Sequence, residues 1–136
     1  MRIPRIYSDQ TLTSGSLVTL KAAPSRHIAQ ALRMGPGDAL ILFNGRGGEF
    51  DAVIDSVNKK SVELAIGEHR SVELESPLSV HLGIGVSRGD RFDWVVQKAT
   101  ELGVASISPL FTERTEVKLK GERLEKKRLH WQQIAI

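Results

Sequence analysis

The hydrophobic period of this chain changes near residue 73, and that change constrains the fold more than any other feature. Before it, short apolar runs are separated by glycine- and asparagine-rich turns, and large apolar side chains occupy every second position of residues 61–66. Such alternation is typical of a half-buried strand. After it, apolar residues recur at three- and four-residue spacing between two apolar runs, which is typical of a helix between strands. The sequence therefore predicts two domains, residues 1–72 and 73–136.

The first region reads as a small barrel. Pro24 begins a helical stretch that the glycine-rich segment 35–37 ends, and Asn44 opens a dense turn. Several short strands with one helix in about seventy residues favour a closed β-barrel. The expected strands are residues 16–20, 38–43, 49–57 and 61–66.

The second region has the order strand, helix, strand, helix, which predicts an α/β unit with a parallel sheet. We expect Asp90 to cap the first helix and Gly103 to end it. The last helix has no stop signal before Ile136, so we expect the chain to be truncated there. The expected elements are residues 78–86, 90–102, 105–111 and 121 onward, with Phe92, Val95, Val96, Ala99 and Leu102 as one apolar stripe and Leu124, Trp131 and Ala135 as another.

Several classes of chemistry lose support from the composition. The chain has no cysteine, which removes disulfides, thiolate metal sites and cysteine nucleophiles. None of its four histidines pairs with another at metal-ligand spacing, so we expect no metal. The segment 83–85 lacks the third glycine of a dinucleotide motif, and no Walker loop or nucleophile elbow is present. Dehydrogenase and hydrolase functions are therefore not indicated.

Charge and apolar-run length bear on partners and location. The net charge of +3 is compatible with an acidic partner such as nucleic acid, but the excess is small. No apolar run approaches the roughly 20 residues that span a bilayer. The N-terminus carries charges where a signal peptide would be apolar. We expect a cytoplasmic location and no membrane contact.

Ligands of open parallel sheets bind beyond the carboxyl ends of the strands, which draws attention to two arginines. Arg88 and Arg114 each follow an expected strand of the second region, where they could hold phosphates or stabilise negative charge on a substrate. The alternative is that they only pair with Asp90, Glu113 or Glu116.

Basic residues of the first region could form a surface for RNA phosphates. Scattered, solvated arginines are the simpler explanation of the same pattern. The candidates are Arg2, Arg5, Arg26, His27, Arg33 and Arg46.

Five segments resemble one known family. They are RIPRIY at 2–7, FNGRGGEF at 43–50, SRGDRFDWVVQKATELGV at 87–104, PLFTERTEV at 109–117 and HWQQIAI at 130–136. Together they resemble the RsmE family, whose members methylate N3 of a uridine in 16S ribosomal RNA with S-adenosylmethionine.

The resemblance implies a PUA-like barrel for residues 1–72, followed by the first half of a SPOUT methyltransferase domain, truncated before its trefoil knot. It implies S-adenosylmethionine as cofactor, the small ribosomal subunit as partner and a homodimer. The cofactor-binding residues are expected beyond Ile136, and no metal is required because the sulfonium supplies the electrophile. Arg88 and Arg114 become candidates for stabilising the uridine anion, and Glu113 for orienting an arginine or assisting proton removal.

One position departs from the family pattern, since Thr115 stands where a cysteine or serine is expected. Two other functions stay open. A non-enzymatic RNA-binding module in ribosome assembly would lack a knot segment after Ile136. Another base-modifying enzyme, such as a pseudouridine synthase, would need a catalytic aspartate, and Asp90 and Asp93 fit helix capping better.

Overall fold

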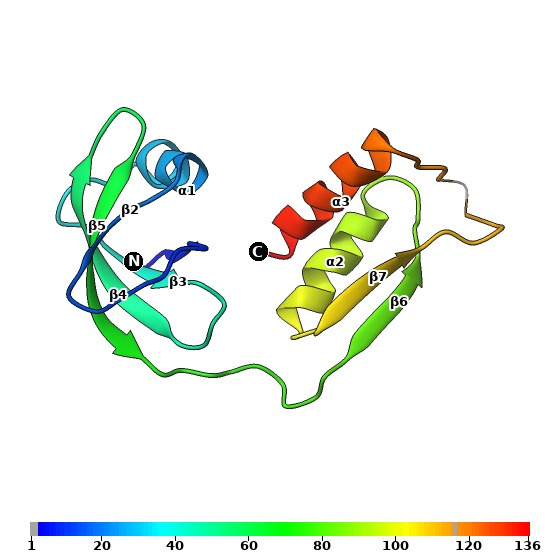
Figure 1. Cartoon of the computed structure of the whole chain (residues 1–136), viewed down its shortest axis with the longest axis horizontal. Helices are drawn as coiled ribbons and strands as arrows, with labels where there is room; N and C mark the ends of the chain where they lie inside the picture. Colours follow the sequence, from blue (N-terminus) through cyan, green and yellow to red (C-terminus); the bar gives the residue numbers. More distant parts are fainter. Residues whose placement is uncertain (1–2, 116) are drawn as a thin grey trace. The chain divides into compact units, whose positions relative to one another are not determined.

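The computed structural model describes residues 3–115 and 117–136 of the chain (Figure 1). Arg2 and Glu116, both named above, lie outside the described residues. The chain divides into two compact units, Met1–Glu73 and Leu74–Ile136, called here the front unit and the back unit. Each is described by itself.

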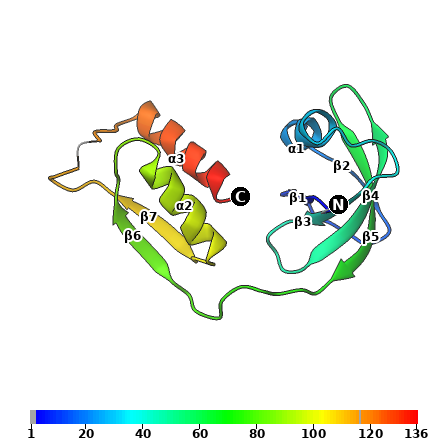
Figure 2. The ribbon, with the colours of Figure 1, turned by 180° about the vertical axis from the view of Figure 1, so that it is seen from behind.

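The front unit is a curved five-stranded sheet with one short helical segment against it (Figure 2). Strand order is β1-β3-β4-β5-β2, and every neighbouring pair is antiparallel except β1 with β3. The elements are β1 (Arg5–Tyr7), β2 (Leu17–Thr19), α1 (Ala22–Arg26), the π-helical turn η1 (His27–Ala31), β3 (Ala39–Phe43), β4 (Glu49–Val57) and β5 (Val62–Arg70).

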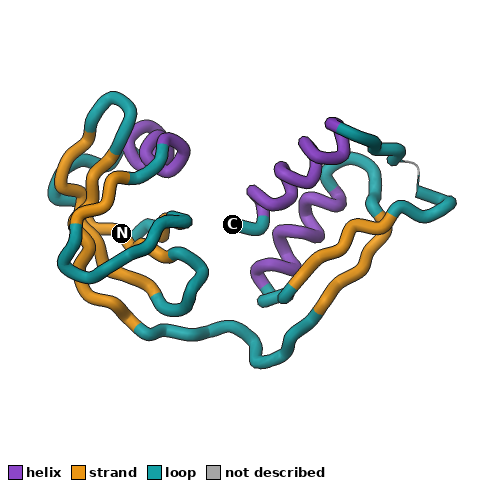
Figure 3. The backbone as a smooth tube through the Cα atoms, viewed as in Figure 1, coloured by secondary structure: helices purple, strands orange, loops and turns teal. Residues whose placement is uncertain are grey.

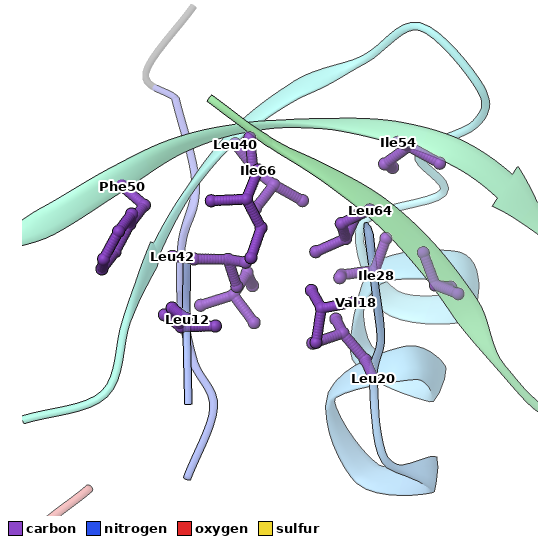
Figure 4. Close-up of a cluster of buried hydrophobic side chains, with 13 residues drawn as sticks. Leu12, Val18, Leu20, Ile28, Leu40, Leu42, Phe50, Ile54, Leu64 and Ile66 are labelled. Atoms are coloured by element: carbon purple, nitrogen blue, oxygen red, sulfur yellow. The ribbon is translucent and has the colours of Figure 1, made fainter. Parts of the chain in front are cut away.

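The core of the front unit lies on the concave side of this sheet (Figure 4). Alternate residues of β3, β4 and β5 point into it, as the period of two requires. Ile28 of η1 covers it from the helical side and is fully buried. The buried residues are Ile6, Leu12, Val18, Leu20, Ile28, Leu40, Leu42, Phe50, Ala52, Ile54, Val62, Leu64 and Ile66.

Two expectations for the front unit need correction. The sheet is not closed, because β1 and β2 stand at opposite ends of the strand order and do not pair within residues 3–73. Strand β1 itself was not expected, since three residues beside Pro4 are too few to show a period. It becomes a strand through tertiary context, pairing in parallel with β3 at Arg5↔Ile41 and Tyr7↔Phe43.

The back unit contains β6 (His81–Gly85), α2 (Arg91–Glu101), β7 (Ser106–Leu110) and α3 (Glu122–Ile134). Figure 3 shows the two strands side by side with both helices on one face. The strands pair in parallel from His81↔Ser106 to Gly85↔Leu110, which confirms the expected parallel sheet. The mixed fold predicted from the change of period is thus confirmed in both units.

The helices of the back unit differ in detail from the prediction. Gly103 ends α2 as expected, with a φ of +82° that favours glycine. Asp90 makes no side-chain capping bond, because its backbone is already helical. Leu102 is 82% exposed, since it follows the last helical turn and leaves the stripe. The buried core of the described back unit is Val86, Phe92, Val96 and Trp131.

Candidate functional site

The parallel pairing of β6 and β7 brings two candidate loops to the same edge of the sheet. Gly85 and Leu110 are register partners, and the Val86 N–H donates to the Leu110 carbonyl over 3.0 Å. Arg88 follows the first strand and Arg114 the second, so both depart from this edge. The carboxyl end of a parallel sheet is where ligands gather. The topology therefore places the two arginines next to one potential binding region.

A compact turn holds the segment that carries Glu113 and Arg114. The Thr112 N–H donates to Thr115 Oγ1 over 2.9 Å, and the Thr115 N–H donates to the Thr112 carbonyl over 3.0 Å. The two threonine hydroxyls lie 3.0 Å apart. Thr115, noted in the sequence only as a departure, is therefore the residue that closes the turn. A Thr-x-x-Thr spacing is the signal that could have revealed it.

Both side chains at the tip of this turn face solvent. Glu113 and Arg114 are exposed, and no ion pair of Arg114 is recorded within residues 3–115 and 117–136. Arg88 is exposed too, although it has an interaction of its own. A guanidinium without a protein carboxylate can offer its fork of N–H donors to a substrate oxygen or phosphate. Arg114 fits that role best among the candidates.

A second polar cluster joins the two helices of the back unit, around Asp93. Its Oδ2 accepts a bond of 2.8 Å from His130 Nε2, and its Oδ1 accepts one of 2.9 Å from Trp131 Nε1. Lys127 Nζ lies 3.4 Å from the same Oδ1. Burial opposes ionisation, but the bonds from His130 and Trp131 and the charge of Lys127 outweigh it and hold the pKa of the Asp93 carboxyl below its ordinary value.

This cluster corrects the expectation that Asp93 caps its helix. Its carboxylate points across to α3, where it bonds side chains 34 to 38 positions later in the chain. No local pattern could show this, because the partners are on another helix. The ring of Trp131 packs on Phe92 at 4.5 Å between centroids, so the polar cluster continues the small apolar core.

One of the basic residues predicted to bind RNA, Arg5, contacts other side chains of the front unit. Arg5 lies 3.0 Å from Glu49 and its guanidinium stands 5.2 Å over the Phe43 ring. Arg5 therefore has a partner within the protein, which neither the RNA-binding interpretation nor that of scattered, solvated arginines predicted. The candidates that are exposed without a recorded ion pair in the described chain are Arg26, His27, Arg33 and Arg46.

Comparison with known proteins gives matches along both units. A family model described as an RNA methyltransferase domain matches residues 74–136, and one described as an RNA methyltransferase PUA domain matches residues 21–67. The chain belongs to this RNA methyltransferase family. The resemblance read from the sequence segments is thereby confirmed.

Similar proteins carry consistent names. Ribosomal RNA small subunit methyltransferase E of Buchnera aphidicola is 36% identical, with 99% of this chain and 55% of the relative covered. The Bacillus subtilis protein of that name is 35% identical, over 94% of this chain and 50% of the relative. The chain thus spans about half the length of these relatives.

Two solved structures are similar in shape as well as sequence, and both hold S-adenosylmethionine. A Legionella pneumophila protein described as a methyltransferase gives a TM-score of 0.94 at 42% identity, covering 98% of this chain and 55% of that one. The methyltransferase E of Neisseria gonorrhoeae gives 0.91 at 37% identity, with the same two coverages. S-Adenosylmethionine is therefore the cofactor of the family.

One cavity of the described back unit gives no support for binding that cofactor. This cavity of about 420 Å³ is lined mainly by apolar groups and lies at the start of β7, away from the edge that carries Arg88 and Arg114. Arg128, its charged residue, is bonded to Glu125 at 2.6 Å. No chemistry is assigned to this cavity.

Two further features are absent from the described residues. Within residues 3–115 and 117–136 no three His, Asp or Glu side chains gather as metal ligands. No described helix has both the length and the apolar character needed to cross a bilayer.

Proposed function

We propose that this chain serves in the S-adenosylmethionine-dependent methylation of N3 of a uridine in 16S ribosomal RNA. The observation that supports it is the shared sheet edge from which Arg88 and Arg114 depart, in a chain of this family. The front unit binds RNA, and the back unit supplies charged groups near the reacting base.

The chemistry needs a group that favours negative charge on the substrate. Uridine N3 becomes a good nucleophile once its proton is lost, which leaves charge on the two flanking carbonyl oxygens. An arginine that donates to such an oxygen stabilises this anion. Arg114 takes this role, Arg88 clamps a nearby phosphate, and Glu113 orients an arginine or assists proton removal. The cofactor, when bound, supplies the methyl group.

The partners follow from the same proposal. The RNA partner is the small ribosomal subunit. Its phosphates are contacted by Arg2, Arg26, His27, Arg33 and Arg46. Arg5 also contacts RNA while its guanidinium stays paired with Glu49. The protein acts as a homodimer in the cytoplasm. Sedimentation equilibrium of a protein of the relatives' length would measure directly whether it is a dimer.

The decisive experiment compares methylation rate with stability in Arg114 variants, made in a protein of the relatives' length that contains this chain. Arg114→Ala should lower single-turnover methylation about a hundred- to a thousand-fold, with RNA affinity changed far less. Arg114→Lys should recover little, because an ammonium lacks the planar fork. A normal rate in a protein with a lower melting temperature would instead make Arg114 a structural residue.

A further inference from the structure

The front unit carries two lysines, Lys59 and Lys60, that neither the fold nor the proposed reaction uses. They form the tip of the β4–β5 hairpin, which a bond of 2.8 Å from the Asn58 N–H to the Ser61 carbonyl closes. Both side chains are exposed. A hairpin with two adjacent cations at its tip presents both charges to solvent.

The structure fixes this hairpin against helix α1. Ser25 is 3% exposed, and its hydroxyl accepts from the Val62 N–H and donates to the Leu20 carbonyl, each over 3.1 Å. The Leu20 N–H in turn donates to the Val62 carbonyl over 2.9 Å. The turn between β4 and β5 lies beside α1 in both Figure 1 and Figure 2. Arg26 comes one residue after Ser25, and Lys60 two residues before Val62, so the three cations belong to neighbouring segments.

Within the part of the chain that the structure describes, no ion pair neutralises this group. None of the recorded ion pairs of the described residues includes Arg26, Lys59 or Lys60. Glu63 is close in sequence, but it alternates with the core residues Val62 and Leu64 and therefore points to the outer face of the sheet, away from α1. Asp55, at the irregularity between Ile54 and Ser56, is exposed and takes part in no ion pair within the described residues. Glu63 also accepts a bond from Ser56. Arg5 differs from these three cations, because it forms an ion pair with Glu49.

We propose that Lys59, Lys60 and Arg26 form a phosphate-binding surface for RNA, built from the β4–β5 turn and α1. It rests on the proposed function, because it names the part of the front unit that meets RNA. Three exposed cations that no ion pair engages within the described residues suit the negatively charged sugar-phosphate backbone of folded RNA, which takes most contacts from lysine and arginine side chains.

The test uses residues 1–136 and a fluorescently labelled hairpin from small-subunit ribosomal RNA, with affinity measured by anisotropy at several KCl concentrations. Replacing both turn lysines (Lys59→Gln with Lys60→Gln) should weaken binding and reduce the slope of log affinity against log salt by about 1.4 to 1.8, since each lost phosphate contact contributes about 0.7 to 0.9. Adding Arg26→Gln should reduce this slope by a further amount of about 0.7 to 0.9, which corresponds to one more lost phosphate contact. The melting temperature should not change, because these lysines have no recorded partner.

A matched control removes two charges elsewhere. Arg123→Gln with Lys126→Gln changes two exposed residues of α3, and its salt slope should equal that of the unmodified chain. Two outcomes would overturn the proposed surface: an equal reduction of the salt slope in both double variants, or an unchanged slope in the turn variant while binding by the unmodified chain depends strongly on salt. Neither outcome would overturn the proposal that the front unit binds RNA. Failure of the unmodified chain to bind the hairpin overturns both.

Discussion

The two units differ in the size of their buried hydrophobic cores. The front unit has 13 buried hydrophobic residues drawn from five strands, a helical turn and the loops beside β2, whereas the described back unit buries Val86, Phe92, Val96 and Trp131. Six of the front unit's side chains fall below 2% exposure, and Phe92 alone does so in the described back unit. The front unit therefore spreads its stability over many contacts, while the back unit depends on a few named ones.

The largest effect expected from this contrast is that of Trp131→Ala. It removes the ring packed on Phe92 and the donor to Asp93 Oδ1 at once. Truncating a buried tryptophan costs about 3–5 kcal/mol, which is most of what so small a core provides. Amide exchange should show α2 and α3 losing protection while β3, β4 and β5 keep theirs.

Leu64→Ala in the front unit is the control for that experiment. It should cost about 2–5 kcal/mol and leave the back unit's amides unchanged. Trp94 remains as a fluorescent reporter of the back unit in both variants, because the chain's tryptophans are Trp94 and Trp131. Simultaneous loss of amide protection in both units after Trp131→Ala would show that they unfold together. It would contradict the view that each unit is stabilised by its own core.

The same contrast explains what the sequence could predict. The expected strand 49–57 coincides with β4, whereas β5 continues to Arg70, four residues beyond the alternation at 61–66 that predicted it. The parallel sheet followed from element order. Strand β1, the exposure of Leu102 and the cross-helix role of Asp93 could not be predicted, since each depends on a partner far away in sequence. Of the site, the strand ends predicted where Arg88 and Arg114 lie. The role of Thr115 was missed, although its spacing from Thr112 is a sequence signal of the turn that it closes.

A smaller effect is expected from Glu49→Gln in the front unit. The Glu49 side chain is 11% exposed and receives Arg5 at 3.0 Å and Arg70 at 3.2 Å. Its loss should cost about 1–2 kcal/mol in denaturant unfolding, below the value for a fully buried pair because both arginines reach solvent. Asp51→Asn, which loses only the contact with Arg70, should cost less. A loss larger than that of Trp131→Ala would contradict the view that the front unit's stability is widely spread.

Asp93→Asn should cost about 1 kcal/mol, since an amide still accepts from Trp131 but loses the charge that faces His130 and Lys127. The pH dependence is the sharper result. Because the folded pKa of Asp93 is lowered, its contribution is present above the unfolded pKa near 3.9 and lost as pH falls through the folded value. Tryptophan fluorescence of urea unfolding below about pH 4 should show a flatter pH response in Asp93→Asn. Equal slopes in both proteins would mean that this carboxylate does not stabilise the back unit.

The smallest effect on stability is expected at the turns that carry the candidate arginines, where each unit uses one side chain to close a loop. In the front unit Asn44 Oδ1 accepts from the Arg46 N–H over 3.1 Å, and in the back unit Thr115 Oγ1 accepts from the Thr112 N–H over 2.9 Å. Both loops reach solvent, so the freed N–H groups can turn to water. The loss per bond should be about 0.5 kcal/mol.

Thr115→Val keeps the volume of the side chain and removes the hydroxyl that also lies 3.0 Å from the Thr112 hydroxyl. Amide exchange at Thr112 should accelerate in Thr115→Val and stay near normal in Thr115→Ser, because serine retains the acceptor. The melting temperature should hardly move in either variant. If Thr115→Ser loosens Thr112 as much as Thr115→Val does, the methyl group rather than the hydroxyl holds the turn. The mobility of Arg114 would then depend on the packing of that methyl group, in contrast to the hydrogen-bonded turn at Asn44 of the front unit.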